Sequence, residues 1–132
     1  AAYAKFNETL NKVNAEQSKK QIEKLKKDGK KGYAAAMEST LRLTELVDKL
    51  EKAPQNADKA AVEKELSEIE AVLKSINNDR GQVLADRYNS VVGSVRQVLA
   101  DSNENNLDEM IQSFNAYIDT YNSTNPEQFD GK

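Results

Sequence analysis

The sequence predicts an all-α fold, an antiparallel up-and-down helical bundle of four to five helices. Apolar residues recur every three or four positions along most of the chain, which places them on one face of a helix. Only five glycines and two prolines occur in 132 residues, and they lie between the periodic stretches. No stretch alternates with period two for long enough to predict a strand. Short connections between long amphipathic helices favour antiparallel neighbours.

Five helical segments follow from this punctuation. They span about residues 3–27, 33–53, 58–77, 81–100 and 106–122. Asp28-Gly29 ends the first, Pro54 follows the second, and Asp58 is a candidate N-cap for the third. The last three carry regular apolar stripes: Val62, Leu66, Ile69, Leu73 and Ile76; Leu84, Tyr88, Val91, Val95 and Leu99; Leu107, Met110, Ile111, Phe114, Ile118 and Tyr121. We therefore predict one bundle domain over residues 1–122 and a short polar tail over residues 123–132.

The first segment has an interrupted stripe. Tyr3, Phe6, Leu10 and Val13 begin it, the next positions are polar, and apolar residues return out of phase at Ile22 and Leu25. One interpretation is a helix that crosses the body and projects into solvent, since polar positions on a helix usually face water. The other is a polar pocket lined by Asn14, Gln17 and Gln21.

Composition removes several classes of function. The chain has no cysteine and no histidine, so thiolate sites and the commonest general base are absent. It also has no glycine-rich phosphate loop. The glutamates at 63, 65, 68 and 70 interleave with lysines and predict a solvated helix face. We therefore expect no enzyme activity, no cofactor and no metal.

Asp101, Asn103 and Asn105 match the opening of a calcium-binding EF-hand loop. The match ends at Asn106, where the loop requires glycine, and at Gln112, where it requires a bidentate glutamate. An asparagine-rich capping loop explains the same residues, with the last helix opening at Asn106.

Seven lysines gather near the end of the first segment. They are Lys19, Lys20, Lys24, Lys26, Lys27, Lys30 and Lys31. One explanation is a solvated helix terminus, because cations interact favourably with the carbonyl end of a helix. The other is a docking surface for an acidic protein partner or for the acidic face of another subunit.

Other anionic partners fit the lysines less well. The pI of about 5.1 and the lack of arginine and aromatic residues among the lysines disfavour nucleic acid. Membrane contact is not expected either, since only Ile22 and Leu25 are available to enter a bilayer. Residues 1–52 carry a net positive charge and residues 53–132 a net negative charge, so the chain is polarised.

Phe114-Asn115 and Tyr121-Asn122, with Ile118 between them, resemble the paired Tyr-Asn ending of LemA-type bacterial helical bundles. The resemblance covers only residues 114–125. The basic and apolar motif that such proteins carry in an early helix is missing here, so no function or site residue is carried over.

Together these features predict a non-enzymatic interaction or structural protein that presents helix faces to a protein partner. The alternative is an extracytoplasmic ligand-binding sensory domain of a membrane receptor. A chain that starts at Ala1 without methionine, with a polar surface, favours an exported bacterial protein located in the periplasm or at the cell surface. The sequence predicts no particular oligomeric state.

Overall fold

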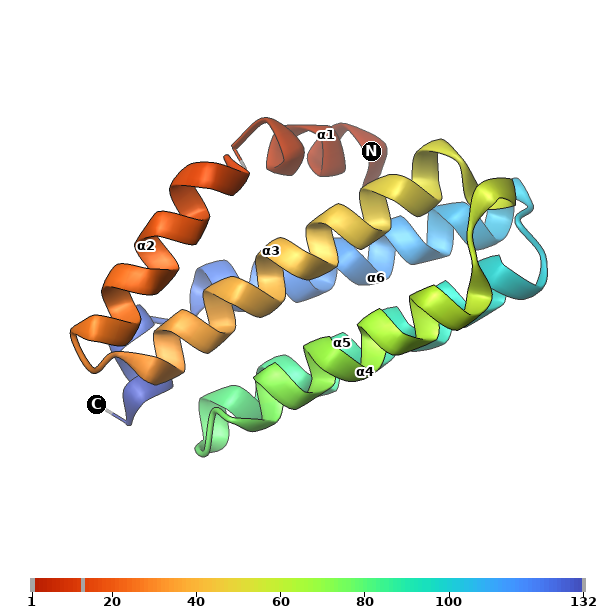
Figure 1. The fold of residues 1–132 in the computed structure, drawn as a ribbon. Coiled ribbons are helices and arrows are strands. Elements are labelled where there is room, and N and C mark those ends of the chain that lie inside the picture. The colour runs from red at the N-terminus through yellow and green to blue at the C-terminus, as the bar shows by residue number, and fades with distance from the viewer. Residues whose placement is uncertain (1, 13, 132) are drawn as a thin grey trace.

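The computed structural model describes residues 2–12 and 14–131, and it is all-helical over these residues (Figure 1). It contains six α-helices and two short 3-10 helices there. They are α1 (Ala2–Lys12), α2 (Ala15–Lys27), α3 (Lys31–Lys52), η1 (Pro54–Asn56), α4 (Lys59–Lys74), α5 (Asp79–Ala100), α6 (Glu104–Ser123) and η2 (Pro126–Asp130). The predicted all-α class is confirmed, while the number of helices exceeds the predicted four to five.

The additional helix comes from a break in the first segment, which we predicted as one helix over residues 3–27. Asn14 has an extended backbone (φ −111°, ψ 104°), and its side-chain oxygen accepts a hydrogen bond from the Gln17 amide at 3.1 Å. This is the geometry of a helix N-cap, so α2 starts afresh at Ala15. Val13, the last apolar residue of the predicted first stripe, lies outside the described residues.

The break lets the two halves of the segment pack on different helices. Phe6 of α1 is fully buried and meets the ring of Phe114 of α6 edge-on, with 5.6 Å between ring centroids. Ile22 and Leu25 of α2 are buried against α3, in a small apolar cluster with Ala34 and Leu41. The interpretation in which the second half projects into solvent is therefore wrong. Apolar residues that are out of phase in sequence are each buried, but on different neighbours.

The main core lies among α3, α4, α5 and α6, which lie lengthwise beside one another (Figure 1). All three predicted stripes face it, and their members are buried or half-buried. Tyr88 and Tyr117 are among the largest fully buried side chains. The Tyr88 hydroxyl donates to the Leu66 carbonyl, and the Tyr117 hydroxyl lies 3.0 Å from that of Thr40. These phenols therefore have internal polar partners, as buried hydroxyls require.

The C-terminal segment packs onto the bundle, although we predicted residues 123–132 as a polar tail. Phe129 is 2% exposed, and its ring stacks between Tyr33 and Tyr121, with centroid distances of 6.5 and 6.1 Å. The Asp130 carboxylate accepts hydrogen bonds from the backbone amides of Gly32 at 2.7 Å and Tyr33 at 3.2 Å. Burial of one ring and capping of α3 thus hold an otherwise polar segment in place.

Two further contacts fix the same segment. The Asn78 side-chain amide donates to the Phe129 carbonyl at 2.9 Å, while the Asn78 oxygen caps the first turn of α5. A Cβ at Gly32 would lie 1.9 Å from the Phe129 carbonyl oxygen, so only glycine fits this close approach. The C-terminal segment thereby connects the starts of α3 and α5.

Candidate functional site

The seven lysines form one surface across the turn between α2 and α3, and we call it the lysine surface. Every one of them is exposed. Gly29 adopts the left-handed conformation (φ 79°) after the last turn of α2, and the Lys30 amide donates to the Leu25 carbonyl at 2.9 Å. Such a glycine ends a helix within two residues. The tight turn sets the basic end of α2 beside the basic start of α3.

The helix dipole explains only part of this surface. Lys24, Lys26 and Lys27 lie in the last turn of α2, where positive charge is favourable. Lys30 and Lys31 instead lie at the start of α3, the end of a helix that disfavours positive charge. Asp130 supplies the negative charge there from the far end of the chain. The positions of Lys30 and Lys31 therefore need another explanation than helix stability.

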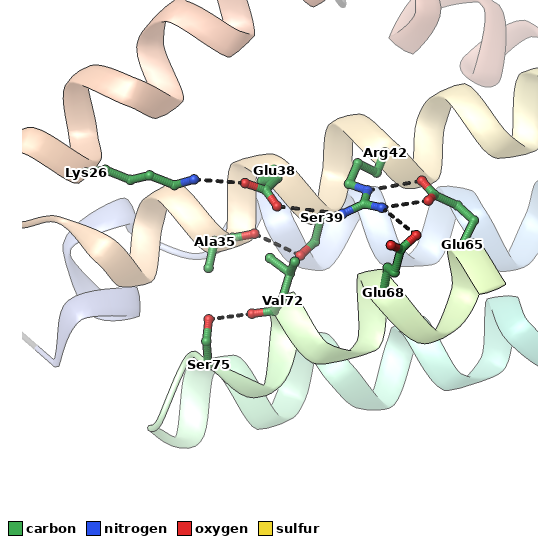
Figure 2. A network of polar contacts seen from close by, with 9 residues as sticks. All are labelled: Lys26, Ala35, Glu38, Ser39, Arg42, Glu65, Glu68, Val72 and Ser75. Carbon is green, nitrogen blue, oxygen red and sulfur yellow. Dashed lines mark hydrogen bonds and ion pairs between the residues drawn. The ribbon is translucent and has the colours of Figure 1, made fainter.

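Most of the lysine surface has no internal counter-charge. Within residues 2–12 and 14–131, Lys26 alone of the seven has a carboxylate in ion-pair range, with its Nζ 3.2 Å from Glu38 Oε1. That pair joins α2 to α3 (Figure 2). The other six ammonium groups project into solvent from the described part of the chain.

A chain of ion pairs continues from Glu38 across to α4. Glu38 also lies 3.8 Å from Arg42, and Arg42 binds Glu65 through two hydrogen bonds of 3.0 and 2.6 Å. The same guanidinium reaches Glu68 at 3.2 Å (Figure 2). The bidentate bond from Arg42 holds the pKa of Glu65 below its usual range. The network links α2, α3 and α4 and engages the carboxylates nearest to the lysine surface.

The glutamates of α4 are exposed or half-exposed, as the predicted solvated face requires, but three of them also pair with other helices. Glu65 and Glu68 pair with Arg42 of α3, and Glu63 pairs with Arg96 of α5 at 2.8 Å. These carboxylates bridge helices, whereas we expected pairs with lysines of the same helix. The sequence offers little signal for this arrangement, because an exposed arginine on one helix has many possible partners.

A groove with a floor of small side chains adjoins the lysine surface between α3 and α4. The apolar lining residues, which we call its floor, are Ala35, Ala71 and Val72. The polar and charged lining residues, which we call its rim, are Lys26, Lys31, Glu38 and Ser75. Its volume is about 530 Å³. Figure 2 shows Ala35 on α3 and Val72 and Ser75 on α4 around this space, with Lys26 on the α2 side. We call it the α3–α4 groove.

A second hollow lies among α1, α2, α3 and α6, and we call it the arm cleft. Its volume is about 280 Å³, with Met37, Leu41 and Ile118 among its apolar lining residues. Gln21 lines it, but Asn14 caps α2 and neither Asn14 nor Gln17 is among its lining residues. The three residues of the predicted polar pocket are thus not brought together.

The asparagine-rich loop before α6 serves to cap helices. The side-chain oxygen of Asn103 accepts from the Asn106 amide at 2.8 Å, so α6 opens at Glu104 and not at Asn106 as we predicted. The Asn106 side-chain amide donates to the carbonyl of Asp101 at 2.9 Å. Among the described residues there is no group of three or more acidic residues placed to hold a metal ion.

No helix in residues 2–12 and 14–131 combines the length and apolar character needed to cross a membrane. Comparison with known proteins adds no relative: no family model, curated protein or solved structure matches this chain.

Proposed function

We propose that this chain is a non-enzymatic interaction protein that holds an acidic protein partner on its lysine surface. The observation that carries the proposal is the set of exposed lysines at the α2–α3 turn, of which only Lys26 has a carboxylate partner among the described residues. Neighbouring like charges repel one another, and Lys30 and Lys31 lie at a helix start that disfavours positive charge, so helix stability does not explain the whole set. Complementary charge on a partner would steer association and fix its orientation.

A protein fits this surface better than a membrane or a nucleic acid. Two large apolar side chains of α2, Ile22 and Leu25, lie between the lysines in sequence. Both are buried against α3 and are not free to enter a bilayer. The lysine surface contains no arginine for bidentate contacts and no aromatic ring for base stacking. Carboxylates of a protein partner remain as the matching groups.

The scaffold that we propose for this role is the antiparallel up-and-down bundle, formed by α3 to α6. Its support is the short connections between these helices and their lengthwise packing (Figure 1). We also propose an extracytoplasmic location, and the polar surface of the chain is its only support. Ion pairs join α3 to α4 beside the lysine surface and hold the two helices in a fixed arrangement. They connect Arg42 with Glu38, Glu65 and Glu68.

Charge reversal tests the proposal. Lysate from the source cells, treated with nuclease, is passed over the immobilised chain and over a K20E/K24E/K27E variant. The matched control is K49E/K59E/K64E, which removes equal charge from exposed lysines outside the lysine surface. We expect an acidic protein to be retained by the unmodified chain and the control but lost from the first variant. Equal retention on all three would refute the proposed role of the lysine surface.

The second candidate function is a ligand-binding sensory domain, and the arm cleft favours it. The cleft combines an apolar floor with polar groups such as Gln21, Tyr121 and Asn122, a mixture typical of small-molecule sites. A thermal-shift screen against a metabolite panel tests it, since a ligand that binds only the folded state raises the melting temperature. A shift that a Gln21→Leu variant abolishes would support this function, and no shift across the panel would argue against it.

A further inference from the structure

The α3–α4 groove and the lysine surface share two residues, Lys26 and Lys31. The apolar floor and the positive charge are therefore parts of one continuous surface. Ala35 is buried, Val72 is half-buried and Ala71 is exposed, so the apolar surface open to a partner comes mainly from Ala71 and Val72. Small residues on two adjacent helices leave room for side chains from a third element.

Ion pairs join α3 to α4 beyond one end of the groove, and Lys31 lies toward the other end. Arg42 follows Glu38 by one helical turn, and its pairs with Glu65 and Glu68 hold α3 against α4 beyond the groove (Figure 2). Glu38 is itself paired, with Lys26 at 3.2 Å and with Arg42 at 3.8 Å. The charge left uncompensated at the rim, among the described residues, is that of Lys31. The lysines of the α2–α3 turn extend the same positive charge outward.

We propose that the α3–α4 groove is the seat of the partner, and that the partner segment is an acidic amphipathic helix. Its apolar side chains cover Ala35, Ala71 and Val72, and carboxylates on its flank face Lys31 and the rest of the lysine surface. This is the helix-in-groove mode of recognition, in which a row of apolar anchors supplies affinity and flanking charges set the orientation. The inference rests on the proposed function and adds the chemical class of the partner segment to it.

A synthetic peptide tests this inference on the full chain. The probe is a fluorescein-labelled helical peptide with leucines along one face and glutamates beside them. A matched peptide carries glutamine in place of every glutamate. Fluorescence anisotropy measures both affinities over a range of ionic strength. We expect the acidic peptide to bind more tightly, with an affinity that falls as salt screens the charges.

Two variants of the chain separate the groove from general electrostatics. Lys31→Glu places like charge at the rim, and Ala71→Gln fills the floor with a longer side chain at an exposed helical position. We expect the first to weaken peptide binding about tenfold and the second about fivefold. The matched controls Lys64→Glu and Ala60→Gln change exposed α4 residues outside the groove and are expected to bind normally. Circular dichroism melts verify that each variant is folded.

The outcomes distinguish this inference from the proposed function. If Lys31→Glu loses peptide binding while Ala71→Gln binds normally, the groove is not the binding site. The lysine surface would then remain as the binding site. No binding to the unmodified chain, or equal binding of the two peptides, would also overturn the inference. Weakening in both variants, with chemical-shift changes at the Ala71 and Val72 methyl groups, would support it. Retention of the natural partner by K20E/K24E/K27E would refute the proposed function, and the peptide measurements would still decide separately whether the α3–α4 groove binds an acidic helix.

Discussion

Replacing Asp130 with alanine is expected to destabilise the fold by about 2 kcal/mol. The carboxylate accepts from the amides of Gly32 at 2.7 Å and Tyr33 at 3.2 Å, and so it caps α3 from outside the helix. The residue in the N-cap position, Lys30, makes no capping bond, and the first turn of α3 contains no acidic residue. Loss of a cap costs about 0.5–2 kcal/mol. Loss of negative charge beside the helix start adds about 0.3–1 kcal/mol.

Urea and thermal unfolding measure this cost. For a domain of this size, a loss of 2 kcal/mol lowers the melting temperature by roughly 6–10 °C. Asp130→Asn retains an acceptor oxygen and is expected to lose about 1 kcal/mol or less. Glu127→Ala removes the same charge from an exposed side chain of the same short helix η2, and a change below about 0.5 kcal/mol is expected there.

The order of the unfolding free energies of the three variants tests whether Asp130 caps α3. If Asp130→Ala and Glu127→Ala are equally stable, then the Asp130 carboxylate does not cap α3. The C-terminal segment would then be held by the buried ring of Phe129 and by the hydrogen bond from Asn78 to the Phe129 carbonyl. Equal losses in Asp130→Asn and Asp130→Ala would instead show that charge, and not the hydrogen bonds, provides the stabilisation.

The helices of the second half of the chain were predictable because their buried faces and their ends depend on residues close together in sequence. Regular spacing of apolar residues fixes which face is buried, and the stripe beginning at Val62 is buried along its whole length. Local hydrogen bonding fixes the ends. Asp58 caps α4 as predicted, by accepting from the amides of Ala60 and Ala61. Gly29 ends α2 where the Asp28-Gly29 pair predicted a stop.

The break at Asn14 left a weaker signal. Asn14 and Gln17 stand in the spacing of a capping box, a residue favoured at the N-cap followed three positions later by glutamine. Lys12, Ala15 and Glu16 beside it favour helix, however, and no glycine or proline interrupts this stretch, so local propensity alone predicts a continuous helix. What decides the break is the burial of Phe6 and Leu25 on different helices, and only the packed structure contains that information.

The C-terminal segment and the groove depend on contacts between distant positions. Asp130 and Gly32 are 98 positions apart, and nothing near Asp130 in sequence identifies a bare helix start as its partner. One phenylalanine among polar residues likewise gives no periodic pattern. The lysine surface was visible in sequence, but its junction with Ala71 and Val72 was not, because α4 is brought beside α3 only by the fold.

Three further substitutions test the local geometry and the charge network. Asn14→Ala removes the cap of α2 and is expected to cost about 1 kcal/mol; faster amide exchange in the first turn of α2 would show it, and unchanged exchange would contradict it. Gly32→Ala places a Cβ 1.9 Å from the Phe129 carbonyl oxygen and is expected to cost about 2 kcal/mol in urea unfolding, with earlier proteolysis of the C-terminal segment; native stability would show that the segment shifts without cost. Glu65→Gln is expected to cost about 1 kcal/mol at neutral pH, because the carboxylate loses its ion pair with Arg42. The pKa of Glu65 is lowered in the folded state from its ordinary value of 4.5, so the folded protein binds this proton less readily than the unfolded chain. The stabilisation from Glu65 is therefore complete above pH 4.5 and is lost as the pH falls through the lowered folded-state pKa. Unfolding curves measured over this range should show the difference between Glu65→Gln and the unmodified chain shrinking toward zero in acid. A difference that stays constant down to about pH 2.5 would mean that the pair with Arg42 is not its source.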